Sequence, residues 1–185
     1  MFAKAVPHTT IAFLLAMGVL VVNPALAQEI TGTFAGSHFP VLSDYDGDGV
    51  PNPVTANQMT GVATVFGRFA GRSVGESRFE GEYCSETEVK LNWVADTAVY
   101  TAANGDVLYA VFVPEEPGDP DSHLCFNFLD STFRATVHLK ISGGTGRFAD
   151  ATGHLIVAST GVLATSGLGG FWQGTLSGRV SLPRK

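Results

Sequence analysis

The segment spanning residues 44–52 has the densest set of groups in the sequence that can bind a metal ion. Three aspartates alternate along it, a glycine follows them, and a backbone carbonyl and an asparagine complete the run. Calcium prefers six to eight oxygen ligands, and this order matches the first part of a calcium-binding loop. The sequence therefore predicts a calcium site whose ligands are Asp44, Asp46, Asp48, Val50 and Asn52.

The twelfth position of this loop pattern departs from an EF-hand. Thr55 stands where an EF-hand has a bidentate glutamate, and no helical periodicity flanks the segment. The pattern is closer to the calcium loops of extracellular repeat modules, which bind the ion weakly. Asp119 or Asp121 can supply a missing ligand. The alternative interpretation is a turn rich in aspartate and glycine that stays in water without an ion.

The sequence has no set of residues typical of a catalytic site. No pair of histidines has zinc-ligand spacing, and no GxSxG segment is present to supply a serine nucleophile. His138 falls on the polar face of a strand pattern, which predicts a surface position. His154 follows a glycine at the start of a strand, where it can border a cavity. We therefore assign no catalytic residue, and the ligand-binding residues stay open.

The first 27 residues are typical of a secretory signal peptide. Lys4 precedes an apolar run from Ile11 to Val22, and small residues at positions 25 and 27 fit a cleavage site after Ala27. The run is shorter than the roughly 20 residues that span a bilayer, so we expect cleavage rather than a membrane anchor. The mature chain, residues 28–185, is then a single secreted or periplasmic domain.

Two cysteines, Cys84 and Cys125, follow the predicted cleavage site. Export places them in an oxidising compartment, where an even number of cysteines predicts a disulfide bond; the alternative is two buried free thiols. The net charge of −6 excludes the basic surface typical of nucleic-acid-binding proteins. No basic amphipathic segment is present to bind an anionic membrane.

Strand-like alternation dominates the mature chain. From Phe133 to Ile141 every second residue is apolar, which predicts a strand with one buried and one solvated face. The same pattern places Trp172, Leu176, Val180 and Leu182 inward in the last strand. Residues 157–163 also fit a short helix, but Gly161 favours a strand there.

Two further segments alternate in the same way. Between residues 76 and 83, Glu76, Glu80 and Glu82 are predicted on a solvated outer face, opposite Phe79 and Tyr83. Leu91, Trp93 and Ala95 are predicted to face inward, which assigns Lys90, Asn92 and Asp96 to the outer face.

Turn signals separate these segments into eight to ten strands. Asn104-Gly105 is a strong hairpin signal between two of them. Two polar loops, at residues 40–58 and 114–122, interrupt the alternation. Many short strands with short connections predict an all-β fold, either an antiparallel barrel or a sandwich.

The glycine-rich segment Gly143-Gly144-Thr145-Gly146-Arg147-Phe148-Ala149-Asp150-Ala151-Thr152-Gly153 resembles the GGTGxFxxAxG corner of allene oxide cyclase and dirigent-like barrels. The hairpin at residues 103–108 is similar to one in small secreted bacterial proteins related to those barrels. The resemblance implies a single antiparallel β-barrel of about eight strands with a central cavity. Such a barrel is wide enough to fill itself with side chains or to hold one small apolar ligand.

Three hypotheses about function follow. The first is an exported, non-catalytic barrel that binds a small hydrophobic ligand or a partner and is stabilised by a disulfide and calcium. The second, implied by the resemblance, is an isomerase or cyclase that acts on a hydrophobic substrate inside the barrel. The third is a structural or adhesive surface protein, suggested by the acidic loops.

Overall fold

The computed structural model describes residues 26–114, 122–164 and 169–183, which form nine strands in one antiparallel sheet. The strands are β1 (Leu26–Ser43), β2 (Asn52–Ala63), β3 (Gly67–Ser85), β4 (Glu88–Ala102), β5 (Val107–Phe112), β6 (His123–Asn127), β7 (Thr132–Gly144), β8 (Thr152–Leu163) and β9 (Gly170–Leu182). Most of the predicted signal peptide 1–27 and of the loop 114–122 lies outside the described residues. Within them, no helix has the length and apolar character needed to cross a membrane.

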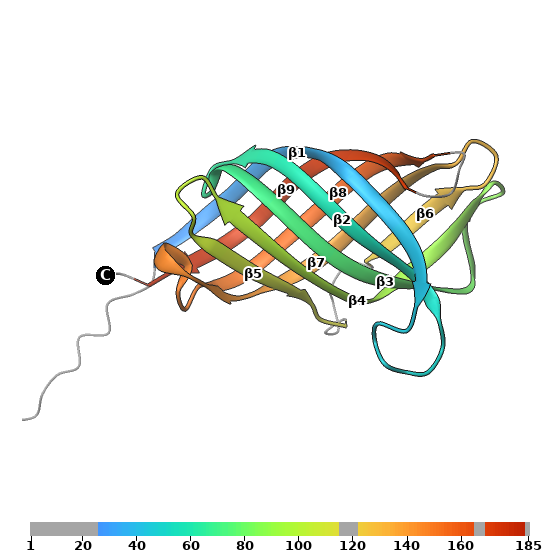
Figure 1. Cartoon of the computed structure of the whole chain (residues 1–185), viewed down its shortest axis with the longest axis horizontal. Helices are drawn as coiled ribbons and strands as arrows, with labels where there is room; N and C mark the ends of the chain where they lie inside the picture. The colour runs from blue at the N-terminus through green and yellow to red at the C-terminus, as the bar shows by residue number, and fades with distance from the viewer. Residues whose placement is uncertain (1–25, 115–121, 165–168, 184–185) are drawn as a thin grey trace, which may run out of the picture.

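The sheet closes into a barrel (Figure 1). β1 pairs with both β2 and β9, while β5 and β6 each pair with β4 on one side and β7 on the other. A closed ring of antiparallel pairs needs an even number of positions. β5 and β6 run in the same direction and share one position, so nine strands make an eight-membered ring. The predicted barrel of about eight strands is confirmed.

The alternation predicted for the clearest strands is confirmed. Val137, Leu139 and Ile141 of β7 are buried, as are Leu176 and Val180 of β9. Residues 157–163 belong to a strand, as their glycine suggested. The Asn104-Gly105 segment forms the turn between β4 and β5, where Gly105 has a φ of 86°.

The glycine-rich segment closes one end of the barrel. A short 3-10 helix, η1 (Gly146–Phe148), presents the fully buried ring of Phe148 to the core. The centroid of that ring lies 5.5 Å from the centroid of Phe66, which in turn stacks on Tyr100 at 5.7 Å. Gly146 has a φ of 58°, and a Cβ there would lie 1.8 Å from Asp106 Oδ1. The segment is therefore a structural plug rather than a binding site.

The acidic loop is shorter than the predicted insertion at residues 40–58. β1 and β2 pair from Pro40↔Thr55 to Ser43↔Asn52, so the loop comprises only residues 44–51. A proline cannot donate a hydrogen bond to a sheet ladder. Pro40 and Pro53 are nevertheless accommodated near the strand ends, and both line the barrel interior.

The predicted alternation between residues 76 and 83 is wrong at its apolar positions. Phe79 and Tyr83 are 46 % and 61 % exposed. Phe79 pairs with Leu91 and Tyr83 with Val89, so β3 carries two more residues than β4 between these pairs. Two extra residues keep the period of two, so the bulge does not reverse the faces. Residues 79–83 are all exposed, which means that neither face of this part of β3 is covered.

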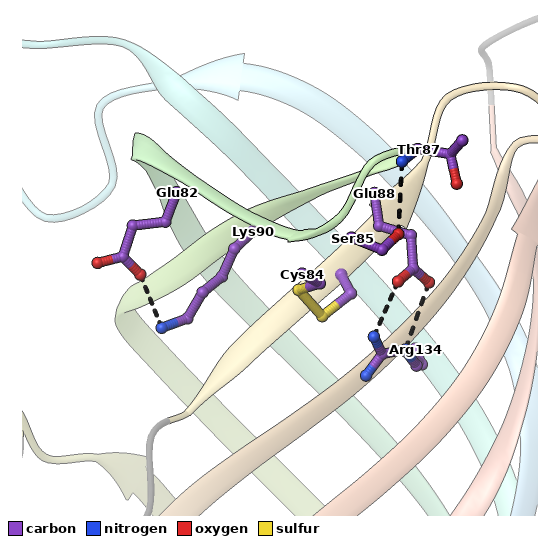
Figure 2. The surroundings of a disulfide bond; sticks show 8 residues. Glu82, Cys84, Ser85, Thr87, Glu88, Lys90 and Arg134 are labelled. Atoms are coloured by element: carbon purple, nitrogen blue, oxygen red, sulfur yellow. Dashed lines mark hydrogen bonds and ion pairs between the residues drawn. A yellow bond between two sulfur atoms is a disulfide. The ribbon is translucent and has the colours of Figure 1, made fainter.

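The predicted disulfide between Cys84 and Cys125 is present (Figure 2). It joins the end of β3 to β6. Figure 2 also shows ion pairs on both sides of it: Glu88 with Arg134 and Glu82 with Lys90, each at 2.8 Å. The disulfide therefore fastens the β3–β4 hairpin to the shortest strand of the barrel.

Replacing both cysteines by serine is expected to lower the free energy of unfolding. The bond closes a loop of 41 residues, for which chain-entropy arguments give about 4 kcal/mol. Urea unfolding of the oxidised wild type, the reduced wild type and the double variant measures the difference. The reduced wild type and the double serine variant should have the same free energy of unfolding. A loss below about 1 kcal/mol relative to the oxidised wild type would contradict the stabilising role of the disulfide.

Candidate functional site: a cavity inside the barrel

The barrel encloses a partly open cavity of about 250 Å³. It lies between the aromatic plug and the end of the barrel that carries the β1–β2 loop. Most of its lining is apolar and comes from eight of the nine strands, all but β5. The large aromatic side chains of the lining are Trp93, Tyr100, Phe126, Phe133 and Trp172. Protein interiors rarely leave voids much larger than a water molecule, so this space needs a physical explanation.

A bulge in β4 turns two polar side chains into this cavity. Gly75 of β3 pairs with Asp96, but two residues later Ser77 pairs with Trp93, three residues away on β4. The extra residue shifts the alternation, so both Trp93 and Asp96 line the cavity. The prediction that Asp96 lies on the outer face is therefore wrong, and the prediction that Trp93 faces inward holds.

Gly75 provides the space for these two side chains. A Cβ at this position would lie 2.6 Å from Trp93 Cζ3 and 2.8 Å from Asp96 Oδ2. Any larger residue at position 75 would displace the carboxyl or the indole. The pair and its glycine therefore form one local arrangement.

Asp96 is buried, and one of its carboxyl oxygens lacks a hydrogen-bond partner among the described residues. Only 6 % of the residue is exposed, and Oδ1 has no partner within the described residues. Burial raises the pKa of this carboxyl to about 8, because the apolar surroundings disfavour its charged form. Burial, together with the charge of Asp96, also raises the pKa of Tyr100, which lines the same cavity. Asp96 is thus a neutral acid at neutral pH.

The indole Nε1 of Trp93 is the second buried polar atom of the cavity lining that lacks a partner in the described ranges. Several other polar groups of the lining have hydrogen-bond partners. Asn57 Nδ2 donates to Ser73 Oγ at 3.0 Å, and Trp172 Nε1 donates to the Gln58 carbonyl at 3.4 Å. An unpaired buried polar group destabilises a protein by about 1–3 kcal/mol, so Asp96 and Trp93 are exceptional within this lining.

His38 is a buried cavity residue that the sequence analysis did not single out. Its Nε2 lies 3.3 Å from the Val162 carbonyl, and because a carbonyl can only accept, Nε2 carries the proton. Burial lowers the pKa of His38, so the ring is neutral at pH 7. His154, in contrast, is exposed and does not line the cavity.

The cavity can perform one kind of chemistry with these groups. A neutral carboxyl donates a hydrogen bond or a proton to an oxygen atom held beside it, and the apolar surroundings strengthen the interaction.

A signal for this site exists in the sequence. Val94 and Ala95 are adjacent apolar residues between Trp93 and Asp96, and such a doublet inside an alternating strand is typical of a bulge.

The acidic loop lies outside the cavity, and the structure brings its three aspartates together. Ligand oxygens of Asp44, Asp46 and Asp48 lie within 4.8 Å of one another. Arg78 pairs with Asp46 at 3.2 Å and also contacts Asp48. The Val50 carbonyl and Asn52, the other predicted ligands, are bonded to each other, since Asn52 Nδ2 donates to that carbonyl at 3.0 Å.

Glu76 anchors this loop to the barrel wall. Its carboxylate is fully buried and accepts hydrogen bonds from the backbone N–H groups of Tyr45 and Asp46 at 2.8 and 2.7 Å, and from Asn52 Nδ2 at 2.8 Å. The prediction of a solvated Glu76 is therefore wrong, because the loop covers it. Glu76 is adjacent to Gly75, so the loop is fixed where the cavity wall bulges.

The disulfide region contains a second group of potential metal ligands. His123 lies close to Cys84 and Cys125, with ligand atoms within 4.8 Å of one another. The two sulfurs are bonded to each other, however, and are not available as thiolates. This group therefore has a structural role.

Comparison with known proteins does not assign a family to this chain. A scan against models of protein families finds no match, and a search of curated proteins finds no similar sequence. The relationship to allene oxide cyclase and dirigent-like barrels therefore stays a proposal. The function must be argued from the cavity and its two unpartnered polar groups.

The stability of the protein is expected to depend on pH through Asp96. Its pKa is about 8 in the folded protein and about 4 in the unfolded chain. Between these values the unfolded chain releases a proton that the folded protein keeps. The free energy of unfolding therefore falls as pH rises, by up to about 1.4 kcal/mol per pH unit.

The Asp96→Asn variant removes this titration while preserving the shape of the side chain. The variant should gain stability relative to wild type as pH rises toward about 8, and the difference should then level off. Urea unfolding of both proteins across this range gives the difference directly. Parallel pH profiles would show that Asp96 titrates normally in the folded protein.

Proposed function

We propose that the mature chain is an exported barrel protein that binds a small apolar molecule in its cavity. The observation that carries this proposal is a mostly apolar cavity of about 250 Å³ whose lining includes two buried polar atoms without partners among the described residues. A cavity of roughly 150 Å³ with an apolar lining already takes up benzene. The available space therefore suits a molecule of one or two rings.

Two further observations support the exported state. The first 27 residues have the charge, apolar run and cleavage site of a signal peptide. Cys84 and Cys125 form a disulfide. Disulfides persist in oxidising compartments and are rare in the cytosol. Both agree with a secreted or periplasmic protein.

Filling the cavity from the protein side tests the proposal. Ala98 is buried and lines the cavity, whereas its neighbour Val99 is 39 % exposed on the outer face of the same strand. Ala98→Phe should weaken binding of tetralin, a neutral two-ring hydrocarbon, by about tenfold or more, and Val99→Phe should leave binding unchanged. Calorimetric titration measures both.

Circular dichroism spectra and melting curves establish that each variant is folded. Ala135→Leu, at another position in the lining, is a milder second variant if Ala98→Phe does not fold. Extraction of the purified wild type, followed by mass spectrometry, identifies any molecule that co-purifies. Failure of wild type to bind tetralin, together with the absence of any co-purifying apolar compound, would reject the proposed function.

A second candidate is an isomerase or cyclase acting on a hydrophobic substrate. The neutral Asp96 carboxyl favours it, because a buried acid with a pKa of about 8 can donate and recover a proton near neutral pH. The resemblance of the glycine-rich corner supports the same idea. An enzyme of this type would lose turnover in Asp96→Asn while retaining ligand affinity.

We also propose that the β1–β2 loop binds calcium weakly. Asp44, Asp46 and Asp48 supply the carboxylates, while Arg78 must be displaced from two of them, which lowers the affinity. With calcium at about ten times the dissociation constant, the wild type should melt roughly 3–5 °C higher than with chelator.

Arg78→Gln should increase the calcium effect, since it removes the competing cation, and a double change of Asp46 and Asp48 to asparagine should abolish it. Differential scanning calorimetry with calcium, magnesium and chelator provides the comparison. Calcium binding would be rejected if wild type and Arg78→Gln each melt at the same temperature with calcium as with chelator.

A further inference from the structure

The two unpartnered groups of the cavity can both donate a hydrogen bond. The indole N–H of Trp93 is a donor and cannot accept. The Asp96 carboxyl is protonated at neutral pH because burial raises its pKa, and its O–H is then also a donor. The bulge in β4 brings both side chains into the lining of one cavity.

The rest of the lining cannot satisfy an anion. Among the described residues that line the cavity, His38, Asp96 and Tyr100 are the titratable ones. His38 is neutral at pH 7, and its Nε2 proton is engaged with the Val162 carbonyl. No lysine or arginine belongs to the described lining. A carboxylate in this space would therefore be desolvated without a counter-ion, which is strongly unfavourable.

We propose that the cavity selects neutral apolar molecules that carry a hydrogen-bond acceptor oxygen, such as a ketone or an ether, with Asp96 and Trp93 as the donors. This inference rests on the proposed function, since it specifies the ligand of the same cavity. The acceptor gives a partner to groups that otherwise remain buried and unpaired. The apolar body of the ligand contacts the aliphatic and aromatic lining.

Three probes with one two-ring skeleton test the selection. Tetralone carries a ketone, tetralin has no acceptor, and the corresponding ring carboxylate is an anion. At pH 6 the wild type should bind tetralone about tenfold more tightly than tetralin, because one good hydrogen bond in a buried site has about that value. The carboxylate should bind more weakly than either. Isothermal titration calorimetry measures all three.

Variants at the two donors identify the source of the preference. Asp96→Leu should bind tetralone and tetralin equally, because leucine cannot donate. Asp96→Asn should retain the preference within about threefold, since its amide N–H still donates. Trp93→Phe should reduce the preference without reversing it. Val99→Leu, on the outer face of β4, serves as the matched control and should behave as wild type.

The outcomes separate this inference from the proposed function. Equal affinities of wild type for tetralin and tetralone, or tight binding of the carboxylate, would overturn the ligand class and leave apolar ligand binding intact. Absence of binding for both neutral probes would overturn the proposed function and this inference together. Should Asp96→Leu fail to fold, Asp96→Asn and Trp93→Phe still decide whether these donors set the preference.

Discussion

Closure of the antiparallel ring is the constraint on which the rest of the structure depends. Every strand has a partner on both sides, because β1 pairs with β9 and because β5 and β6 together occupy one position between β4 and β7. An eight-membered ring has an interior just wide enough for side chains or for one small molecule. In this protein one half of the interior is filled by the aromatic plug around Phe148 and Phe66, and the other half is not filled.

The unfilled half takes its polar character from a local irregularity. A regular β4 would place Asp96 in solvent, where its charge would be hydrated. The extra residue in β4 instead turns the carboxyl inward beside Trp93, opposite a glycine that has no side chain to compete for the space. Glu76, one residue further along β3, is covered by the acidic loop and accepts three hydrogen bonds. Two acids close together in the sheet thus have opposite environments: both oxygens of Glu76 accept hydrogen bonds, whereas Asp96 Oδ1 has no partner in the described part of the chain.

The sequence predicts the regular parts of this fold and misses the irregular ones. The alternation in β7 and β9, the Asn104-Gly105 turn and the disulfide follow from local patterns and composition, so they can be recognised without the structure. The inward position of Asp96 is harder to predict. The Val94-Ala95 doublet indicates a bulge, but strict alternation assigns Asp96 to the outer face, because one inserted residue reverses the assignment of every residue beyond it. The burial of Glu76 depends on a loop about 30 residues away in sequence, and no local pattern reports such a contact. The cavity itself results from all the strands together.

The pairing of β1 with β9 also makes the ring of strands continuous between the first and the last strand. Residues 26 and 182 are direct partners at one end of the barrel, so a short turn can join these two strand ends. β5 and β6 are each held by β4 and β7 rather than by each other. The polypeptide can therefore be opened between Phe112 and His123 and still contain every pairing of the ring, which makes this protein a natural framework for circular permutation.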